Sequence, residues 1–264
     1  MIVALIDNGS LEPAAHRNLR TVAAEISART GINVRAVSWK HSDRVPEIAL
    51  DGVHAWTLAS FIRAMFALGQ REFVFVPFFI SPQGAIGSAL FRDLEKLQRE
   101  LGEFEVTFTD GLAAVGVLPT IAADRVRTCI QSYQLTRPPV VVVDHGGPSA
   151  DSAALRDQLA AEIATTLAVD VASVSAASME GVHPPLLSDW LQRDTLVNRD
   201  VVVAPLFLSP GRHAGVDGDI RRICEAAPAR SHVTELVGTH PLVIDALAGA
   251  LRTTLTTVQT HIFA

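Results

Sequence analysis

The sequence predicts an α/β fold made of two similar domains in tandem, each a roughly four-stranded parallel sheet flanked by helices. Three observations predict it. Short apolar runs alternate with longer stretches of helical period. The runs do not alternate between polar and apolar residues, which is typical of parallel strands buried on both faces. Three short segments also occur twice, in the same order, which indicates an internal duplication.

The apolar runs predict eight strands, four in each half of the chain. In order they are Ile2–Ile6, Val34–Ser38, Phe73–Val76, Glu105–Phe108, Val140–Val143, Val171–Ser175, Val201–Ala204 and His232–Leu236. The stretches between them have the period of helices. One such stretch carries apolar residues four apart, and these share one helix face: Leu155, Leu159, Ile163 and Leu167. Strands that alternate with helices imply βαβ units.

The repeated segments follow strands at matching places in the two halves, or open the last helix of each half. The pairs are Asp7–Ser10 with Asp144–Gly147, Pro77–Pro82 with Pro205–Pro210, and Gly116–Pro119 with Gly238–Pro241. The offset between copies falls from 137 to 128 to 122 residues, as a duplication with loop deletions would produce. The natural linker is Gln134–Pro139, so the predicted domains are residues 1–136 and 137–264.

Composition excludes several classes of protein. Hydrophobic residues make up 48% of the 264, enough for a sizeable core, and the net charge of −6 argues against general nucleic-acid binding. Cys129 and Cys224 are not in a CxxC pair, which favours a reducing compartment over a disulfide scaffold. The first ten residues do not form a signal peptide, and no run reaches the roughly 18 apolar residues of a membrane span. We expect a cytoplasmic protein without nucleic-acid or membrane partners, and the oligomeric state stays open.

The two copies differ at three strand ends where chemistry is possible. The pairs, first copy and then second, are Asn8 with His145, Lys40 with Glu180 in a looser match, and Ala85 with His213. In open parallel sheets the carboxyl ends of the strands carry the ligand site. The second copy therefore brings two imidazoles and a carboxylate to one edge of its sheet.

These residue types suit two kinds of site. Imidazole and carboxylate bind divalent metal ions, and they also suit acid and base catalysis because histidine titrates near neutrality. A single histidine at a strand end is usually a hydrogen-bonding loop residue. The functional interpretation rests on His145, Glu180 and His213 occupying equivalent strand ends of the same half.

Four segments of the C-terminal half resemble the sirohydrochlorin cobaltochelatases and ferrochelatases, the class II tetrapyrrole metal chelatases. They are Val140–Gly146, Met179–Pro184, Val201–His213 and Gly238–Leu242. The most specific is the string Pro-Leu-Phe-Leu-Ser-Pro-Gly-Arg-His that ends at His213. The resemblance is strong over residues 139–252 and weaker, but in order, over residues 1–132. It implies two chelatase-like domains, of which the first is a degenerate copy.

The resemblance also implies an activity and the roles of residues. The expected reaction is ATP-independent insertion of Co²⁺ or Fe²⁺, or of Ni²⁺, into sirohydrochlorin or a related tetrapyrrole, as in cobalamin and siroheme biosynthesis. The metal is a substrate, and no organic cofactor is expected. His145 and His213 would bind the metal or take pyrrole protons, and Glu180 would assist. Residues implied to contact the polyanionic tetrapyrrole are Arg212, Ser209 and Gly146.

The sequence departs from the family around the first histidine. The turn reads Asp144-His145-Gly146-Gly147-Pro148, where the family usually has Gly-His-Gly-Ser-Arg, and His183 replaces an acidic residue. Asp144 either adds a carboxylate to the site or caps the turn; the second alternative follows from its counterpart Asp7, which stands in the copy without histidines.

Other side chains carry open alternatives. His240 either supports the site or contacts the ligand. Arg221 and Arg222 either pair with substrate carboxylates or are solvated. Trp39 is a candidate for stacking on the ring, whereas Phe79 is expected in the core. We treat the remaining histidines as surface or structural residues: His16, His41, His54, His232 and His261.

Three other functions compete with the chelatase reaction. A carrier of metal or tetrapyrrole would keep the site without turnover, and the altered turn after His145 favours it. An esterase would need a Gly-x-Ser-x-Gly elbow, and a dinucleotide-binding domain would need Gly-x-Gly-x-x-Gly after a strand. The sequence has neither motif.

Overall fold

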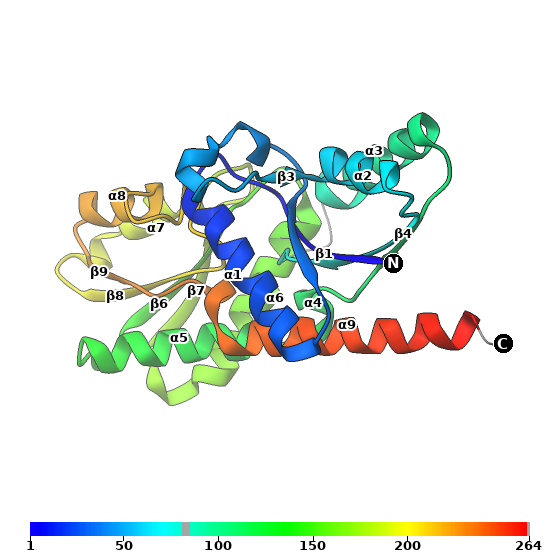
Figure 1. Cartoon of the computed structure of the whole chain (residues 1–264). Coiled ribbons are helices and arrows are strands. Elements are labelled where there is room, and N and C mark those ends of the chain that lie inside the picture. The colour runs from blue at the N-terminus through cyan, green and yellow to red at the C-terminus, as the bar shows by residue number, and fades with distance from the viewer. Residues whose placement is uncertain (81–84, 263–264) are drawn as a thin grey trace. The chain divides into compact units, whose positions relative to one another are not determined.

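The computed structural model describes the backbone of residues 1–80 and 85–262 (Figure 1). The chain forms two compact units. Unit 1 comprises Met1–Val115 together with Pro241–Ala264, and unit 2 comprises Gly116–His240. Within these described residues, no helix is both long enough and apolar enough to cross a bilayer.

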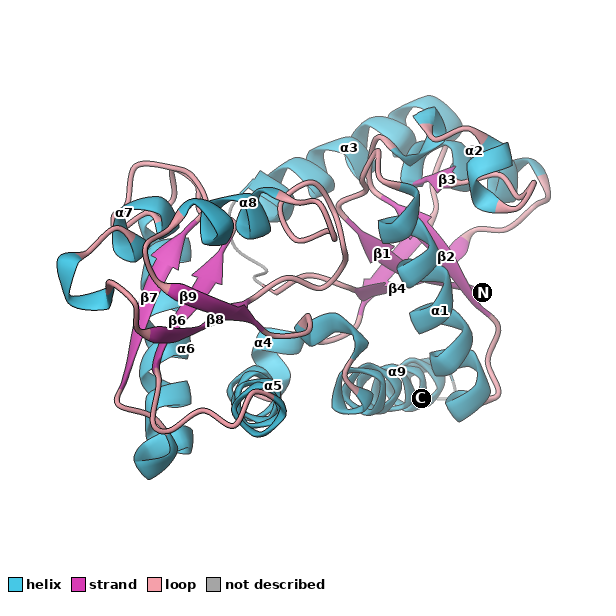
Figure 2. Ribbon diagram, turned by 90° about the vertical axis from the view of Figure 1, so that its left-hand side faces the viewer, coloured by secondary structure: helices cyan, strands magenta, loops and turns pink. Residues whose placement is uncertain are grey.

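Unit 1 is built around a five-stranded parallel sheet in the order β3-β2-β1-β4-β5. Its strands are β1 (Ile2–Asp7), β2 (Val34–Ser38), β3 (Trp56–Thr57), β4 (Glu72–Pro77) and β5 (Glu105–Phe108). Its helices are α1 (Pro13–Thr30), α2 (Leu58–Ala67), α3 (Ala85–Leu101), α4 (Leu112–Val115) and α9 (Pro241–Ile262). In Figure 2, α1 and α9 lie on one side of this sheet and α2 and α3 on the other.

Unit 2 has a four-stranded parallel sheet in the order β7-β6-β8-β9. Its strands are β6 (Pro139–Asp144), β7 (Ser173–Ser178), β8 (Asp200–Pro205) and β9 (Arg230–Val233). Its helices are α5 (Leu118–Ser132), α6 (Ala150–Leu167), α7 (Leu187–Leu191) and α8 (Asp219–Ala226). Figure 2 shows α5 and α6 on one side of the sheet and α7 and α8 on the other. The predicted α/β class is confirmed for both units.

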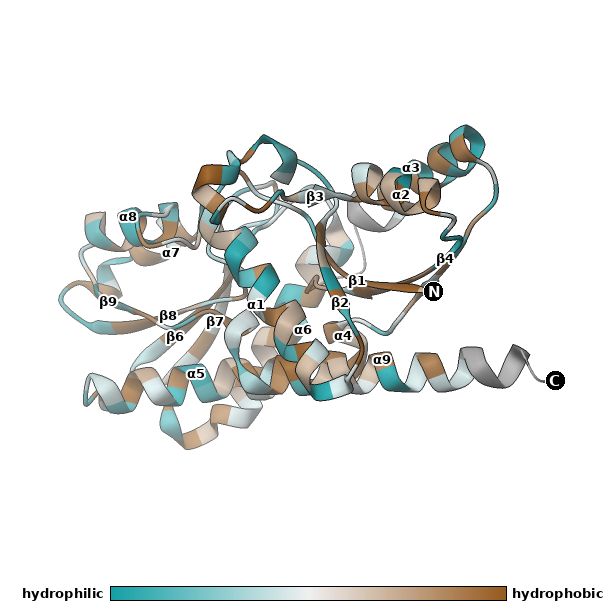
Figure 3. Cartoon of the chain, viewed as in Figure 1, coloured by the Kyte–Doolittle hydropathy of each residue, from teal (hydrophilic) through white to brown (hydrophobic). Residues whose placement is uncertain are grey.

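The central strand β6 shows why the apolar runs lack alternation. All four valines from Val140 to Val143 are fully buried, with 0% of their surface exposed. Val141 and Val143 belong to the apolar cluster with Trp190 of α7, and side chains alternate between the faces of a strand, so their neighbours face the other helix layer. Each buried valine contributes about 1.5–3 kcal/mol of hydrophobic free energy. Figure 3 shows central strands of both units in hydrophobic colours.

The pairing registers of the two sheets match residue by residue. In unit 1, Asp7 pairs with Ser38 at the end of β1; in unit 2, Asp144 pairs with Ser178 at the end of β6. The same match holds at β4 and β8, where each strand ends on a proline. The predicted similarity of the two sheets is therefore confirmed at the level of register.

Three strands depart by more than one residue from the prediction. β3 was not predicted, because two residues are too short to show a period. β7 begins and ends later than the predicted Val171–Ser175, because a 3₁₀ turn precedes it and its serines obscure the apolar signal of an edge strand. β9 ends at Val233 rather than at Leu236. The chain leaves the sheet at Thr234, whose hydroxyl donates to the carbonyl oxygen of Glu235 at 2.9 Å.

The last helix of each half of the sequence packs in the unit built on the other half's sheet. Helix α5 packs on α6 and β8 in unit 2, and α9 packs on α1 in unit 1. The chain therefore passes between the compact units after Val115 and after His240. A helix buries its apolar stripe wherever a sheet face is open, and sequence order does not specify which sheet that is. The predicted boundary of the duplicated segments stays a prediction.

Asp7 allows a first prediction, on stability. Its side chain is buried at the end of β1, and burial raises the pKa of its carboxyl group from 3.8 to about 6, although Oδ1 accepts a hydrogen bond from the Gly9 N–H at 2.9 Å. The folded state therefore binds this proton more tightly than the unfolded state. The stabilisation that comes from this tighter proton binding is fully present below about pH 4 and is lost as the pH rises through 6. We expect Asp7→Asn to raise the free energy of unfolding at pH 7 by about 1–3 kcal/mol.

Urea unfolding between pH 4 and 7 measures this effect. The wild-type free energy of unfolding should contain a component that falls over this range, and Asp7→Asn should lack it. The exposed Asp110 of the same unit gives the control Asp110→Asn. An identical pH slope in the wild type and Asp7→Asn would contradict the prediction.

Candidate metal site

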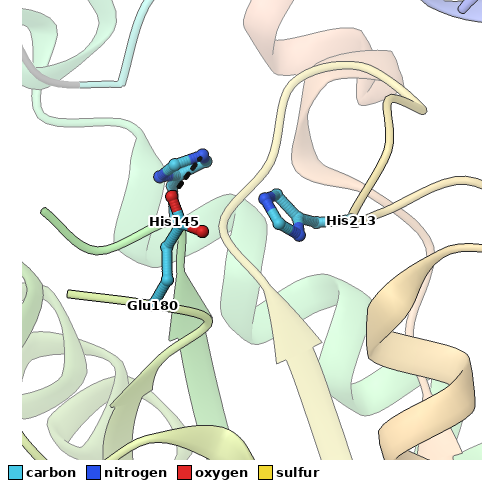
Figure 4. A group of neighbouring side chains, drawn as sticks. All are labelled: His145, Glu180 and His213. Atoms are coloured by element: carbon cyan, nitrogen blue, oxygen red, sulfur yellow. Dashed lines mark ion pairs between the residues drawn. The ribbon is translucent and has the colours of Figure 1, made fainter.

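Unit 2 brings the three predicted residues together at the carboxyl edge of its sheet. His145 directly follows β6, Glu180 follows β7 by two residues, and His213 lies in the loop after β8. One ligand atom from each of the three side chains lies within 4.8 Å of the others (Figure 4). Because β6 lies between β7 and β8 in the sheet, the loops that carry these residues are neighbours.

Distances within the group suit a shared ion. His145 Nε2 lies 3.7 Å from Glu180 Oε1, and the rings of His145 and His213 stand nearly perpendicular, with centroids 4.9 Å apart. The side chains of His145 and Glu180 are 58% and 54% exposed, whereas His213 is 11% exposed. Two of the three candidate ligands are thus open to solvent, and the third is largely buried.

The tautomer of His145 follows from its neighbour. Nδ1 forms a 3.1 Å hydrogen bond with the backbone oxygen of Gly146, and a carbonyl oxygen can only accept. When the ring is neutral, its proton is therefore on Nδ1. The lone pair on Nε2, the atom nearest Glu180, is then free to bind a metal ion.

Gly146 lets the two loops approach each other. It has φ of +80°, and a Cβ built on it would lie 1.8 Å from the backbone oxygen of Glu180. The Glu180 N–H donates to the backbone oxygen of His145 at 3.1 Å, which ties the loops together. Gly146 therefore has a backbone role here, and its predicted contact with tetrapyrrole stays a prediction.

Gly146→Ala gives the second prediction. We expect it to lower the free energy of unfolding by about 2 kcal/mol or more, because the left-handed backbone costs about 1–3 kcal/mol and the contact with Glu180 forces a loop to move. Affinity for Co²⁺ should fall with it. Gly147→Ala is the matched control, since nothing lies within 4 Å of a Cβ there. Thermal unfolding and Co²⁺ titration measure both effects, and equal behaviour of the two variants would contradict this role of Gly146.

His213 lies in a glycine-rich loop that closes on itself. Gly211 N–H donates to the oxygen of Ser209 at 2.9 Å, and Gly215 N–H donates to the oxygen of Gly211 at 2.8 Å. The backbone oxygen of His213 accepts from Ile220 N–H at 3.1 Å, which joins the loop to α8. These bonds hold the imidazole over the end of β8.

Asp219 faces His213 and was not predicted. Its Oδ2 lies 2.8 Å from His213 Nδ1, outside hydrogen-bond geometry, and 3.4 Å from Nε of Arg212. Arg212 itself is 79% exposed. The sequence signal for Asp219 was an acidic residue in the first turn of a helix, six residues after His213. A carboxylate beside the second nitrogen of a metal-binding histidine is a recurrent arrangement.

Asp144 has a partner of its own. Ser178 Oγ donates to Asp144 Oδ1 at 2.5 Å. Burial raises the pKa of Asp144, while the bond from Ser178 and the charge of Arg156 act against this rise. In the described part of the chain, the group of side chains that could hold a metal ion contains neither Asp144 nor His183. His183 Nε2 instead lies 3.2 Å from the backbone oxygen of Pro148.

The other candidates take structural contacts. Nε2 of the buried His240 lies 3.1 Å from Asp124 Oδ2 on α5, which favours a supporting role. Arg222 pairs with Asp219 at 3.4 Å. Phe79 packs against the core of unit 1, as predicted, and Trp39 Nε1 donates to Asp93 Oδ2 at 3.2 Å.

Among the remaining histidines, two illustrate the structural role expected of this group. Burial lowers the pKa of His16 to about 4. His232 Nε2 lies 2.9 Å from Asp200 Oδ1.

Unit 1 has different chemistry at the equivalent edge. The backbone N–H of Lys40 donates to the backbone oxygen of Asn8 at 3.2 Å, as the backbone N–H of Glu180 does to that of His145. The looser pairing of Lys40 with Glu180 is therefore correct. Lys40 Nζ lies 3.3 Å from Asp93 and 4.0 Å from the ring of Trp39. An ammonium thus stands where unit 2 has a carboxylate. Ser81–Gly84, the counterpart of the segment before His213, lies outside the described residues, and Ala85 begins α3.

Comparison with known proteins gives one family and several similar folds. Residues 139–254 match the CbiX family model, and no curated protein matches the chain. SirB from Bacillus subtilis with Fe³⁺ is 14% identical, with 98% of each chain covered and a TM-score of 0.67. CbiX, the terminal enzyme for siroheme biosynthesis in denitrifying bacteria, is 19% identical, with 96% of this chain and 99% of that one covered and a TM-score of 0.68.

A third solved structure is similar over most of its length. The sirohydrochlorin chelatase SirB from Bacillus subtilis subspecies spizizenii, in complex with cobalt, is 16% identical, with 96% of this chain and 95% of that one covered and a TM-score of 0.63. At these identities the structures show a shared fold. The family match lies over the half of the chain that holds His145, Glu180 and His213.

Proposed function

Because residues 139–254 match the CbiX family model, we propose that this chain is a class II chelatase, which inserts a divalent metal ion into sirohydrochlorin or a related tetrapyrrole without ATP. The observation that carries the proposal is the convergence of His145, Glu180 and His213 within the matched segment. Two neutral imidazoles and a carboxylate are a suitable donor set for a first-row divalent ion. The proposed metals are Co²⁺ and Fe²⁺, with Ni²⁺ as a further candidate.

The reaction has a simple balance. A divalent ion enters the free-base macrocycle, two pyrrole N–H bonds break, and two protons leave. The metal must therefore be held loosely enough to be released, and bases must lie beside the ring. Three protein ligands, two of them exposed, leave coordination positions for water or for a pyrrole nitrogen.

We assign the histidines and Glu180 distinct tasks. His145 Nε2 and His213 bind the incoming metal, and each imidazole can accept a proton once the metal has left it. Asp219, beside His213 Nδ1, orients this ring and supports its charge when it is protonated. Glu180 neutralises the ion during delivery or removes a pyrrole proton.

Arg212 is proposed to bind the substrate. Its guanidinium is 79% exposed and neighbours His213, so it can pair with a carboxylate of a polyanionic tetrapyrrole. The overall charge of −6 makes such a local cation useful for binding. Ser209 and Gly146 are proposed to contact the ring through the loops that they shape. A cytoplasmic location stays a prediction.

A carrier of metal or tetrapyrrole is the alternative function. The feature that favours it is the turn Asp144–Pro148, which lacks the serine and arginine that usually follow the family's histidine. A carrier would bind Co²⁺ at the same three residues but would not accelerate insertion.

Metal insertion by the wild-type protein tests the proposal. Purified protein is mixed with Co²⁺ or Fe²⁺ and sirohydrochlorin under anaerobic conditions, and the change in tetrapyrrole absorbance is followed against a reaction without protein. We expect a rate clearly above the uncatalysed one for at least one metal. If the rates with and without protein are equal, for sirohydrochlorin and for other free-base tetrapyrroles, the protein is not a chelatase. Binding of Co²⁺ in that case would support the carrier function.

A further inference from the structure

A buried arginine lies beneath the candidate site. Arg156 on α6 is 3% exposed, although a charged side chain is rarely buried without partners. Its Nε and Nη2 contact Asp157 Oδ1 at 2.8 and 2.7 Å. Its Nη1 donates to Ser178 Oγ at 2.7 Å and to the backbone oxygen of His183 at 3.3 Å.

The two Nη1 acceptors lie on either side of Glu180 in the sequence. Ser178 is the last residue of β7, and His183 lies in the loop that follows, so one nitrogen fixes both ends of the segment that presents Glu180. Ser178 Oγ in turn donates to Asp144 Oδ1 at 2.5 Å, next to His145. A chain of two hydrogen bonds therefore joins α6 to the strand ends that carry two of the three ligands.

The same loops also contact each other directly. Gly181 has φ of +106°, and a Cβ on it would lie 2.7 Å from the backbone nitrogen of Gly147. The ring of His183 reaches the oxygen of Pro148 at 3.2 Å. With so little space between the loops, a shift of the Glu180 loop is transmitted to the His145 loop.

Unit 1 has a leucine at the equivalent position. Helices α1 and α6 each have 18 residues. The start of α6 lies 137 residues after the start of α1, which is the same offset that relates Asp7 to Asp144. With this offset, Arg156 aligns with Leu19, which is fully buried. The three other aligned positions that are buried in both helices agree in character: Val22 with Leu159, Ala23 with Ala160 and Ile26 with Ile163. Among the positions that are buried in both helices, Arg156 alone is charged where its counterpart is apolar, and it lies in the unit that carries the candidate ligands.

We propose that Arg156 is a positioning residue of the metal site, which holds Ser178 and His183 so that Glu180 and His145 face the same ion. The inference deepens the proposed function and rests on it. Arg156 touches neither metal nor substrate in this role. It acts through hydrogen bonds to the residues that flank the ligands, and changes to such outer partners typically lower metal affinity about 10–100-fold.

Titration of the metal-free full-length protein with Co²⁺, followed by the visible spectrum of the bound ion, tests the proposal. Arg156→Leu installs the residue of unit 1 and should weaken Co²⁺ binding about 10–100-fold and alter the spectrum of the ion that does bind. Arg156→Lys should be intermediate, because an ammonium keeps the charge but not the planar set of donors. Arg127→Leu is the control: Arg127 pairs with Asp170 at 2.8 Å, just after the far end of α6.

The outcomes separate this inference from the proposed function. Wild-type affinity and an unchanged spectrum in Arg156→Leu would overturn the positioning role alone. A wild-type protein that binds no Co²⁺ would overturn the metal site and this role with it. If Arg156→Leu does not fold, Ser178→Ala breaks the link to Asp144 while keeping the arginine. It should weaken Co²⁺ binding by about tenfold, and unchanged affinity would overturn the proposal.

Discussion

Replacing His213 with alanine is expected to lower the affinity for Co²⁺ by about two orders of magnitude. Structural zinc sites with four ligands bind with about 10–16 kcal/mol, or roughly 3 kcal/mol per ligand, and about 1.4 kcal/mol corresponds to a factor of ten. His213 is the most buried of the three ligands, and its loss also leaves Asp219 without the neighbouring ring. His145→Ala should act similarly. Equilibrium titration with Co²⁺, and with Ni²⁺ as a second ion, measures the effect.

His232→Ala is the matched control for this prediction. His232 is also a partly buried histidine of unit 2 that pairs with an aspartate, but it lies on β9 and outside the ligating group. We expect its Co²⁺ affinity to equal that of the wild type. Unchanged affinity in both His145→Ala and His213→Ala would remove the basis for the site. A loss in His232→Ala as large as theirs would show that the effect is not specific.

Glu180→Gln is expected to lower the turnover number for metal insertion by about 10²–10⁴-fold, the usual contribution of a general base. The KM for the tetrapyrrole should change little. Glutamine keeps the shape of the side chain but cannot take a proton or neutralise the metal, and Glu180 lies 3.7 Å from His145 Nε2. Its side chain is about half exposed, so the substitution leaves no buried cavity. Steady-state insertion of Co²⁺ into sirohydrochlorin, corrected for the uncatalysed rate, gives both constants.

Glu162→Gln controls for the loss of one negative charge. Glu162 lies on the exposed face of α6, where Oε1 accepts a hydrogen bond from Gln158 at 2.8 Å. Its turnover number should match the wild type. If Glu180→Gln instead raised KM at constant turnover, Glu180 would hold the ring rather than deliver the metal or remove a proton.

Much of this molecule could be predicted from the sequence, because local patterns carried the information. Apolar runs without alternation predicted parallel strands covered on both faces, and Val140–Val143 is fully buried as expected. The duplicated segments predicted which strand ends are equivalent, and parallel strands end at a common edge. Those two facts were enough to predict that His145, Glu180 and His213 would meet, although none of them is near another in the sequence.

Only the tertiary structure could decide the features that depend on contacts between elements distant in sequence. Arg156 and Asp219 look like ordinary helix charges in the sequence. Their importance follows from the side chains that face them, which are Ser178 for one and His213 for the other. The exchange of α5 and α9 between units is likewise absent from any local pattern. An amphipathic helix specifies that one of its faces is buried but not which of two similar sheets covers that face, so the packing of the whole chain determines the choice.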